Sequence, residues 1–159
     1  LRDWSSDVCS SDLGGATTRV YALLDDARQA RDVKRLIASR WKQGEDLPGF
    51  GHALYPEGDP RATELLAMLR AQPVDAATLA LLDKVIAAAE AASGRRPNVD
   101  FTLAAMCMAY GLPAAPALSI FAASRLAGWL AHVLEQQEHG RLIRPRASYT
   151  GLEPENGAA

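Results

Sequence analysis

The sequence predicts an all-α fold, and three observations support this prediction. Apolar residues recur at intervals of three and four along most of the chain, as they do on one face of an amphipathic helix. Residues typical of helix starts and stops bound these segments. Few runs resemble strands. The 159 residues are enough to bury the core of one domain.

The first two expected helices cover residues 17–30 and 32–43. The second places its apolar side chains on one face, namely Val33, Leu36, Ile37 and Trp41. Asp59 followed by Pro60 predicts the N-cap and first turn of a third helix, which should run to about residue 70.

Three further helices are expected in the second half of the chain. Asp75 can cap a helix that ends at Gly94, and Asn98 can cap a short buried helix that ends at Gly111. The last helix is apolar and ends near residue 137.

The stretch 112–134 of this last helix is as long as a bilayer-crossing helix, but Arg125 near its middle would be costly in lipid. A helix that is apolar all round is more simply the buried centre of a soluble protein. We therefore expect no membrane span, and we expect Arg125 to be buried with a compensating partner.

The chain divides into three parts by composition. Residues 1–13 contain Ser-Ser-Asp twice, lack any periodicity and resemble translated sequencing-adapter stretches, so we interpret them as an assembly artefact. Residues 14–151 carry the helical pattern, and residues 152–159 should be a flexible tail.

Charge and cysteine content narrow the function classes. The chain has 17 Lys and Arg against 19 Asp and Glu, with no basic stripe, which disfavours nucleic-acid binding. Cys9 and Cys107 lie in unlike contexts, which suits a reducing compartment and predicts a cytoplasmic protein. No spacing of His and Cys indicates a metal site.

Two loops carry the residues best suited to chemistry. In the first, glycines on either side of Phe50 permit close backbone approach to a ligand, and His52 and Arg61 follow. His52 taken alone is more simply a turn histidine held by backbone groups. After the second loop, Asp100 occupies the first turn of an apolar helix, where it is either a partner of the helix dipole or a catalytic carboxylate.

Taken together and in order, these motifs are similar to the C-terminal part of citrate synthases and 2-methylcitrate synthases. The motifs are Gly-Phe-Gly-His at 49–52, Asp-Pro-Arg at 59–61, Pro-Asn-Val-Asp at 97–100, Ser-Arg-x-x-Gly-Trp-x-Ala-His at 124–132 and Arg-Pro-Arg-x-x-Tyr-Thr-Gly at 144–151. The resemblance implies a helical homodimer whose subunits have a large and a small domain. This chain would supply part of the small domain and the returning C-terminal helices of the large domain.

The resemblance also implies roles for individual residues. Asp100 would remove a proton from the methyl carbon of an acyl-CoA, and His52 would polarise the carbonyl of oxaloacetate. Arg61, Arg125 and Arg144 would bind carboxylates, with Arg144 reaching into the partner's site. His52, Asp100, Arg61 and Arg125 should therefore line one cleft.

Other implications concern coenzyme A and the start of the chain. The backbone around Leu47, Gly49 and Gly51 would lie near the CoA adenine, and acyl-CoA would be a substrate, with no further cofactor. Leu13 stands where the family has a histidine that stabilises the enolic intermediate. The preceding half of the family's pattern, with much of the large domain, is also absent. We therefore expect a C-terminal fragment that is inactive alone and exposes its last helix. The side chains concerned are Leu118, Ile120, Phe121, Trp129 and Leu130.

Three functions are consistent with these residues. The first is condensation of acetyl-CoA with oxaloacetate to give citrate and CoA. The second is the same reaction with propionyl-CoA, as in a 2-methylcitrate synthase, or a lyase reaction of the related cleavage. The third is a non-catalytic paralogue that serves as a ligand sensor or dimerisation module, which would have no need of Asp100 beside an apolar helix.

Overall fold

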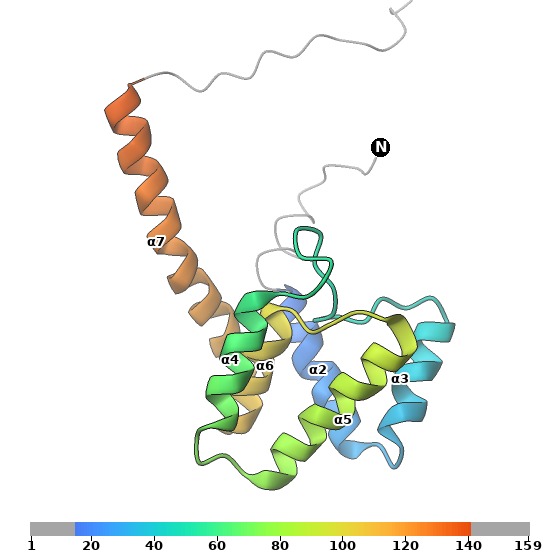
Figure 1. The fold of residues 1–159 in the computed structure, drawn as a ribbon. Coiled ribbons are helices and arrows are strands. Elements are labelled where there is room, and N and C mark those ends of the chain that lie inside the picture. Colours follow the sequence, from blue (N-terminus) through green and yellow to red (C-terminus); the bar gives the residue numbers. More distant parts are fainter. Residues whose placement is uncertain (1–14, 141–159) are drawn as a thin grey trace, which may run out of the picture. The chain divides into compact units, whose positions relative to one another are not determined.

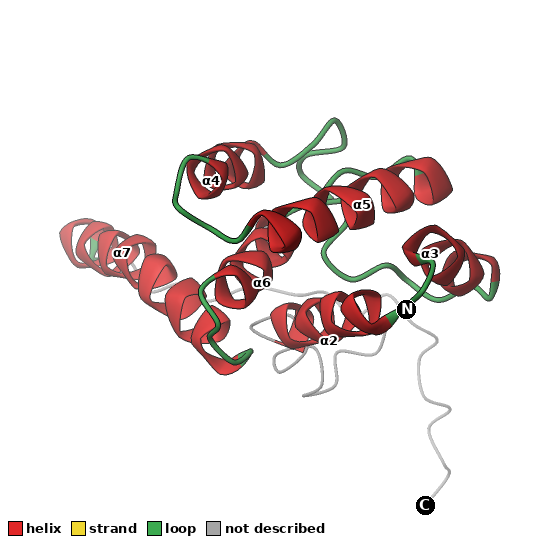
Figure 2. Cartoon of the chain, turned by 90° about the horizontal axis from the view of Figure 1, so that it is seen from below, coloured by secondary structure: helices red, strands yellow, loops and turns green. Residues whose placement is uncertain are grey.

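The computed structural model describes residues 15–140, and this part of the chain is helical (Figures 1 and 2). All six expected helices are present, with ends within about two residues of the expected positions. They are α2 (Ala16–Gln29), α3 (Val33–Lys42), α4 (Pro60–Arg70), α5 (Ala76–Ser93), α6 (Val99–Ala109) and α7 (Ala115–His139).

The predicted caps explain where three of these helices begin. The Asp59 carboxylate accepts a hydrogen bond from the backbone N–H of Arg61 at 3.0 Å, and that of Asp75 accepts one from Thr78 at 2.9 Å. Asn98 accepts from the backbone N–H groups of both Asp100 and Phe101. Each cap satisfies amide donors that the first helical turn would otherwise leave unpaired.

One main core unites most of the helices. α2 packs against α3, α5 and α6, while α4 packs against α6 (Figure 1). Phe101 of α6 is fully buried, and its ring lies 5.1 Å from that of Phe50 in the loop after α3. Leu47 of the same loop is also fully buried. The core therefore anchors the loop that carries His52.

The chain separates into two compact units, one ending at Leu126 and the other beginning at Ala127, with the division inside α7. In the first unit, Ala117 packs with Leu103 and Cys107 of α6 in a small second cluster. The Cys107 thiol is free and buried, and this burial raises its pKa. Every residue of the candidate site discussed below that the structure describes belongs to the first unit.

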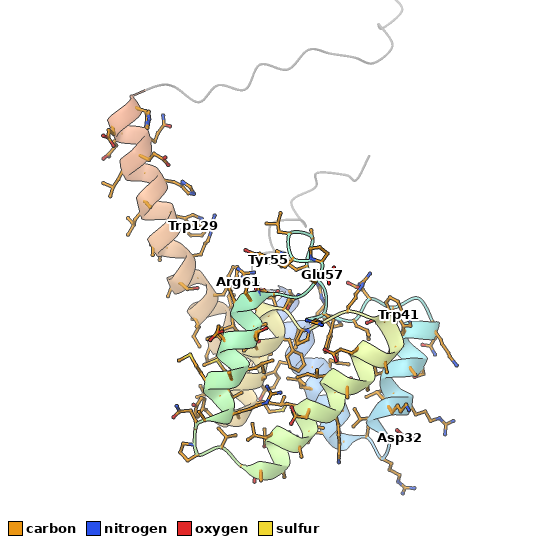
Figure 3. The ribbon with its side chains drawn as sticks, viewed as in Figure 1. Asp32, Trp41, Tyr55, Glu57, Arg61 and Trp129 are labelled. Carbon is orange, nitrogen blue, oxygen red and sulfur yellow. The ribbon has the colours of Figure 1, made fainter. Side chains whose placement is uncertain are left out.

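Exposure of α7 corrects one expectation. Ala117 is the one buried residue of this helix, whereas Leu118, Ile120 and Leu130 are more than 40% exposed, and so is Trp129 (Figure 3). A buried central helix is therefore the wrong description of α7 in this chain. The reason is that no described segment covers its apolar side chains.

Two related expectations have different outcomes. The exposure expected for this chain is confirmed at Leu118, Ile120, Trp129 and Leu130, while Phe121 is partly buried against the second cluster. Arg125 is exposed, so its expected burial is wrong for this chain. By length and composition α7 could cross a membrane, but one such helix is weak support for a membrane protein.

Candidate active site

Backbone hydrogen bonds join the two loops that carry the candidate residues. The N–H of Gly51 donates to the carbonyl of Arg96 at 2.8 Å, and the N–H of Asn98 donates to that of Gly49 at 2.9 Å. The Asn98 side chain adds a third bond, from Nδ2 to the carbonyl of Gly51, across 47 positions of sequence. This pairing places the residue after Gly51, which is His52, beside the start of α6.

Gly49 is needed where the first loop meets the core. Its φ is +86°, which L-residues rarely adopt, and a Cβ there would lie 2.7 Å from Cγ2 of Val20 and 3.0 Å from Cβ of Phe101. We predicted from sequence that glycine allows close approach to a ligand. In the structure, the close approach at this position is to the protein's own core.

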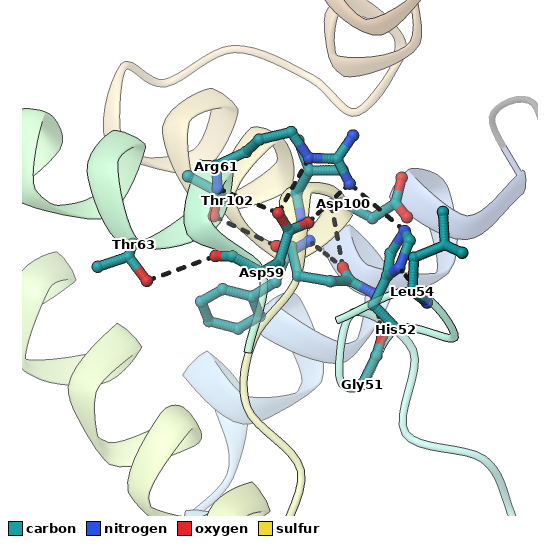
Figure 4. A network of polar contacts seen from close by, with 11 residues as sticks. Gly51, His52, Leu54, Asp59, Arg61, Thr63, Asp100 and Thr102 are labelled. Carbon is teal, nitrogen blue, oxygen red and sulfur yellow. Dashed lines mark hydrogen bonds and ion pairs between the residues drawn. The ribbon is translucent and has the colours of Figure 1, made fainter. Parts of the chain in front are cut away.

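The hydrogen bonding of His52 determines which ring nitrogen carries the proton. The backbone N–H of Leu54 donates to Nδ1 at 3.1 Å, so Nδ1 is an acceptor. In the neutral ring the proton is then on Nε2, which lies 3.4 Å from Nη2 of Arg61 (Figure 4). Because Nη2 of Arg61 is also a donor, this contact is then not a hydrogen bond, and both groups can donate to an acceptor placed beside them.

Arg61 is held by two neighbours. Its Nε and Nη2 donate to the two carboxylate oxygens of Asp59, both at 2.9 Å, in a bidentate pair. The guanidinium carbon also lies 5.5 Å from the centre of the Tyr55 ring, and that ring is 4.9 Å from the ring of His52. The Asp59 contact raises the pKa of Arg61, which keeps it charged.

Asp59 and Asp100 have opposite electrostatic environments. Burial raises the pKa of Asp59, but hydrogen bonds from Arg61 and from the backbone N–H of Val99 outweigh this, and the pKa lies below its ordinary value. Burial also raises the pKa of Asp100, and the nearby charges of Arg61 and His52 oppose the rise only in part. Asp59 is thus a stable carboxylate, and Asp100 is a more basic one.

The structure therefore brings His52, Arg61 and Asp100 together, as Figure 4 shows. A donor and a cation lie beside a carboxylate of raised pKa, which is an arrangement suited to removing a proton and stabilising negative charge on oxygen. A cavity of about 700 Å³ lies between α2, α3 and α5, and His52, Arg61 and Asp100 do not line it.

The other predicted site residues have different positions. Leu47 is fully buried, Gly49 is buried and Gly51 is partly buried, so contact of their backbone with CoA remains a prediction. Arg125 lies on α7, and no described hydrogen bond or ion pair joins it to the other three, so its place in the cleft remains a prediction. Arg144 and Leu13 are outside the described residues.

Sequence reasoning missed two residues of this cluster. Asp59 was recognised only as a helix cap, although its carboxylate also pairs with Arg61. The second is Tyr55, whose ring lies beside both His52 and Arg61. The close spacing of Asp59 and Arg61 on either side of a helix start was a usable signal, because one carboxylate can then serve the amide and the guanidinium.

Comparison with known proteins identifies the family. Residues 11–146 match the family model described as citrate synthase, C-terminal domain. The chain belongs to the citrate synthase family. It is 40% identical over 142 residues to a citrate synthase of Haloferax volcanii, and 32% identical over 145 residues to a 2-methylcitrate synthase of Shewanella oneidensis.

Solved structures confirm the citrate synthase-like helical fold. The chain matches a citrate synthase from Thermotoga maritima with a TM-score of 0.69 at 28% identity, covering 88% of this chain and 40% of that one. It matches a citryl-CoA lyase from Hydrogenobacter thermophilus with a TM-score of 0.74 at 25% identity, covering 91% and 60%. The two relatives named above match 87% and 89% of this chain, but the chain spans only about 38% of their length.

The raised pKa of Asp100 predicts that this carboxylate destabilises the fold when ionised. A carboxyl whose folded-state pKa is raised contributes full stability below its unfolded pKa, and this contribution is lost as pH rises through the folded value. We expect Asp100→Asn to unfold at higher urea than the wild-type chain at pH 8, with a smaller difference at pH 4. A less stable variant at pH 8 would contradict this assignment of the burial effect.

Proposed function

We propose that this chain forms part of the active site of an enzyme that condenses acetyl-CoA with oxaloacetate to give citrate and CoA. One observation carries the proposal, namely that Asp100, with its raised pKa, lies beside the Nε2–H of His52 and the guanidinium of Arg61. Membership of the citrate synthase family supports it.

In the proposed reaction, the Asp100 carboxylate takes a proton from the methyl carbon of the acyl-CoA. The resulting carbon nucleophile attacks the ketone carbon of oxaloacetate, and the carbonyl electron pair moves to oxygen. His52 donates a hydrogen bond to that oxygen, and Arg61 holds a substrate carboxylate. The alkoxide takes a proton from solvent to become the hydroxyl of the product, and Asp100 releases its proton to solvent. Water then cleaves the thioester and releases the thiol of CoA.

A second candidate uses propionyl-CoA in place of acetyl-CoA. The 32% identity to a 2-methylcitrate synthase favours keeping it. One methylene changes discrimination by only about 1–3 kcal/mol, so a few pocket residues suffice to decide between them. The similarity to a citryl-CoA lyase also keeps the cleavage of citryl-CoA as a test reaction.

The test is an assay of the whole protein that carries this chain. Acetyl-CoA or propionyl-CoA is supplied with oxaloacetate, and thiol release is followed. In a separate assay, citryl-CoA is supplied and its cleavage is followed. Faster thiol release with acetyl-CoA supports the first proposal, and faster release with propionyl-CoA supports the second. No turnover of any of the three would favour a non-catalytic paralogue. The 159-residue chain assayed alone tests the expectation that it is inactive.

We also propose that the enzyme is a homodimer in which Arg144 binds a carboxylate in the partner's site. Arg144→Ala in the whole protein should then raise the KM for oxaloacetate about 10-fold or more, because a charged hydrogen bond is worth about 1.5–3 kcal/mol. Thermal unfolding should change little. Steady-state kinetics and equilibrium sedimentation would check this, and full activity in a demonstrated monomer would count against it.

A further inference from the structure

We propose that Asp59 is a positioning residue, which fixes the guanidinium of Arg61 at the place where it meets a substrate carboxylate. This inference rests on the proposed function of Arg61. It concerns a residue that never needs to touch substrate itself, because the Asp59 side chain is fully buried, with 0% exposed surface.

The first support is the geometry of the pair. Asp59 uses both carboxylate oxygens on Arg61, at Nε and at Nη2, so the plane of the guanidinium is fixed as well as its distance. The side chain of Arg61 is 48% exposed, and Nη1 takes part in neither bond. The Nε and Nη2 edge of the guanidinium is therefore fixed by Asp59, while Nη1 is left to bind a ligand.

The second support is that Asp59 connects two helices. Oδ2 accepts a hydrogen bond from the backbone N–H of Val99 at 3.0 Å, and Val99 is the first residue of α6 and the neighbour of Asp100. The same carboxylate thus contacts α4 through Arg61 (Figure 4) and α6 through Val99. Arg61 and Asp100 consequently keep a fixed relative position, although they belong to different helices.

The charge of Asp59 makes the positioning role distinguishable from a purely electrostatic one. Asp59 cancels much of the positive charge that Arg61 offers to an anionic substrate. If Arg61 acted only through its charge, removing the Asp59 carboxylate would strengthen oxaloacetate binding. If geometry is what matters, the same change should weaken the reaction. The two views therefore predict opposite results for one substitution.

The test is Asp59→Asn, alone and combined with Arg61→Ala, in the whole protein. Asparagine is as good an N-cap as aspartate, so the start of α4 should be kept. Since misplacement by about 1 Å can cost 10²-fold, we expect kcat/KM for oxaloacetate to fall about 10- to 100-fold in Asp59→Asn. Adding the substitution to Arg61→Ala should cause no further loss.

Asp83→Asn is the matched control, because Asp83 pairs with Arg70 at 2.7 Å on an exposed surface. It should leave kcat/KM unchanged. An Asp59→Asn enzyme with wild-type or tighter use of oxaloacetate would overturn the inference. So would an equal loss on the wild-type and Arg61→Ala backgrounds, which would indicate a role in folding alone.

An NMR measurement on the 159-residue chain separates this inference from the proposed function. The Nε–H of Arg61 should exchange with water more slowly than that of Arg70, whose contact with Asp83 uses Nη2, and Asp59→Ala, which removes the accepting oxygen, should abolish the difference. Equal exchange in the wild type would show that no clamp exists. A slow Arg61 Nε–H in a protein that does not turn over oxaloacetate would instead refute the proposed function.

Discussion

Replacing Asp100 with asparagine should lower the rate of condensation about 10²- to 10⁴-fold, which is the usual contribution of a positioned general base. Asparagine has nearly the same shape but cannot accept the proton from the methyl carbon. The KM for oxaloacetate should change little, because the proposed contacts of that substrate are with His52 and arginines. Thiol release by the whole protein measures both quantities.

Two controls sharpen this result. Asp83→Asn removes an exposed carboxylate that lies outside the cluster and should keep the wild-type rate.

The wild-type rate should also rise with pH through the raised pKa of Asp100, because only the ionised carboxylate is a base. A rate in Asp100→Asn within a factor of two of the wild type would exclude this residue as the base. Since the same substitution should stabilise the fold at pH 8, loss of rate could not be attributed to unfolding.

Gly49→Ala should destabilise the chain by about 2–5 kcal/mol. A left-handed backbone costs a non-glycine residue about 1–2 kcal/mol, and overpacking of a core adds about 1–3 kcal/mol. Overpacking is expected because the new Cβ would lie 2.7 Å from Val20 and 3.0 Å from Phe101. Urea unfolding of the 159-residue chain, followed by circular dichroism, measures the loss.

Gly44→Ala is the matched control for the backbone contribution. Gly44 has a φ of +78°, but a Cβ there would have no atom within 4 Å. It should therefore lose only the smaller, conformational part of the free energy of unfolding. Combining Gly49→Ala with Val20→Ala should be less damaging than the sum of the two single changes, because the smaller side chain makes room. Equal losses in Gly44→Ala and Gly49→Ala would contradict the steric explanation.

The helices could be predicted from sequence because their signals are local. Asp59, Asp75 and Asn98 each cap the helix that follows within two or three residues, and Gly94 ends α5 with a φ of +69°. Such contacts depend on neighbours in the chain and need no knowledge of the tertiary fold. For this reason the predicted helix ends agree closely with the structure.

The candidate site was less accessible to sequence reasoning. Considered alone, His52 is more simply a turn histidine than a functional one, and Asp100 is as consistent with a helix-dipole partner as with a catalytic carboxylate. Family resemblance, rather than spacing, suggested that they meet. The hydrogen bonds that bring them together are made by backbone atoms of Gly49, Gly51 and Asn98, whose pairing leaves no pattern of side chains to detect.

Burial of α7 could not be judged from its composition. Apolar character shows that a helix prefers to be covered, but whether it is covered depends on the segments available to pack against it. Trp129 and Leu130 are therefore exposed here despite their hydrophobicity. Arg125 is exposed on the same helix, and its expected partner is a ligand rather than a described residue.

The pairing of the two loops also bears on how such a protein can diverge. The distance between His52 and Asp100 is set largely by main-chain N–H and C=O groups, which are the same for nearly every amino acid. Substitutions at Arg96, for example, can alter the surface while leaving these bonds in place, since the bond uses only the Arg96 carbonyl. Substitutions in these loops can therefore accumulate without changing the distance between His52 and Asp100. Under the proposed function, acyl-chain preference can then change through pocket substitutions without altering the spacing of His52 and Asp100.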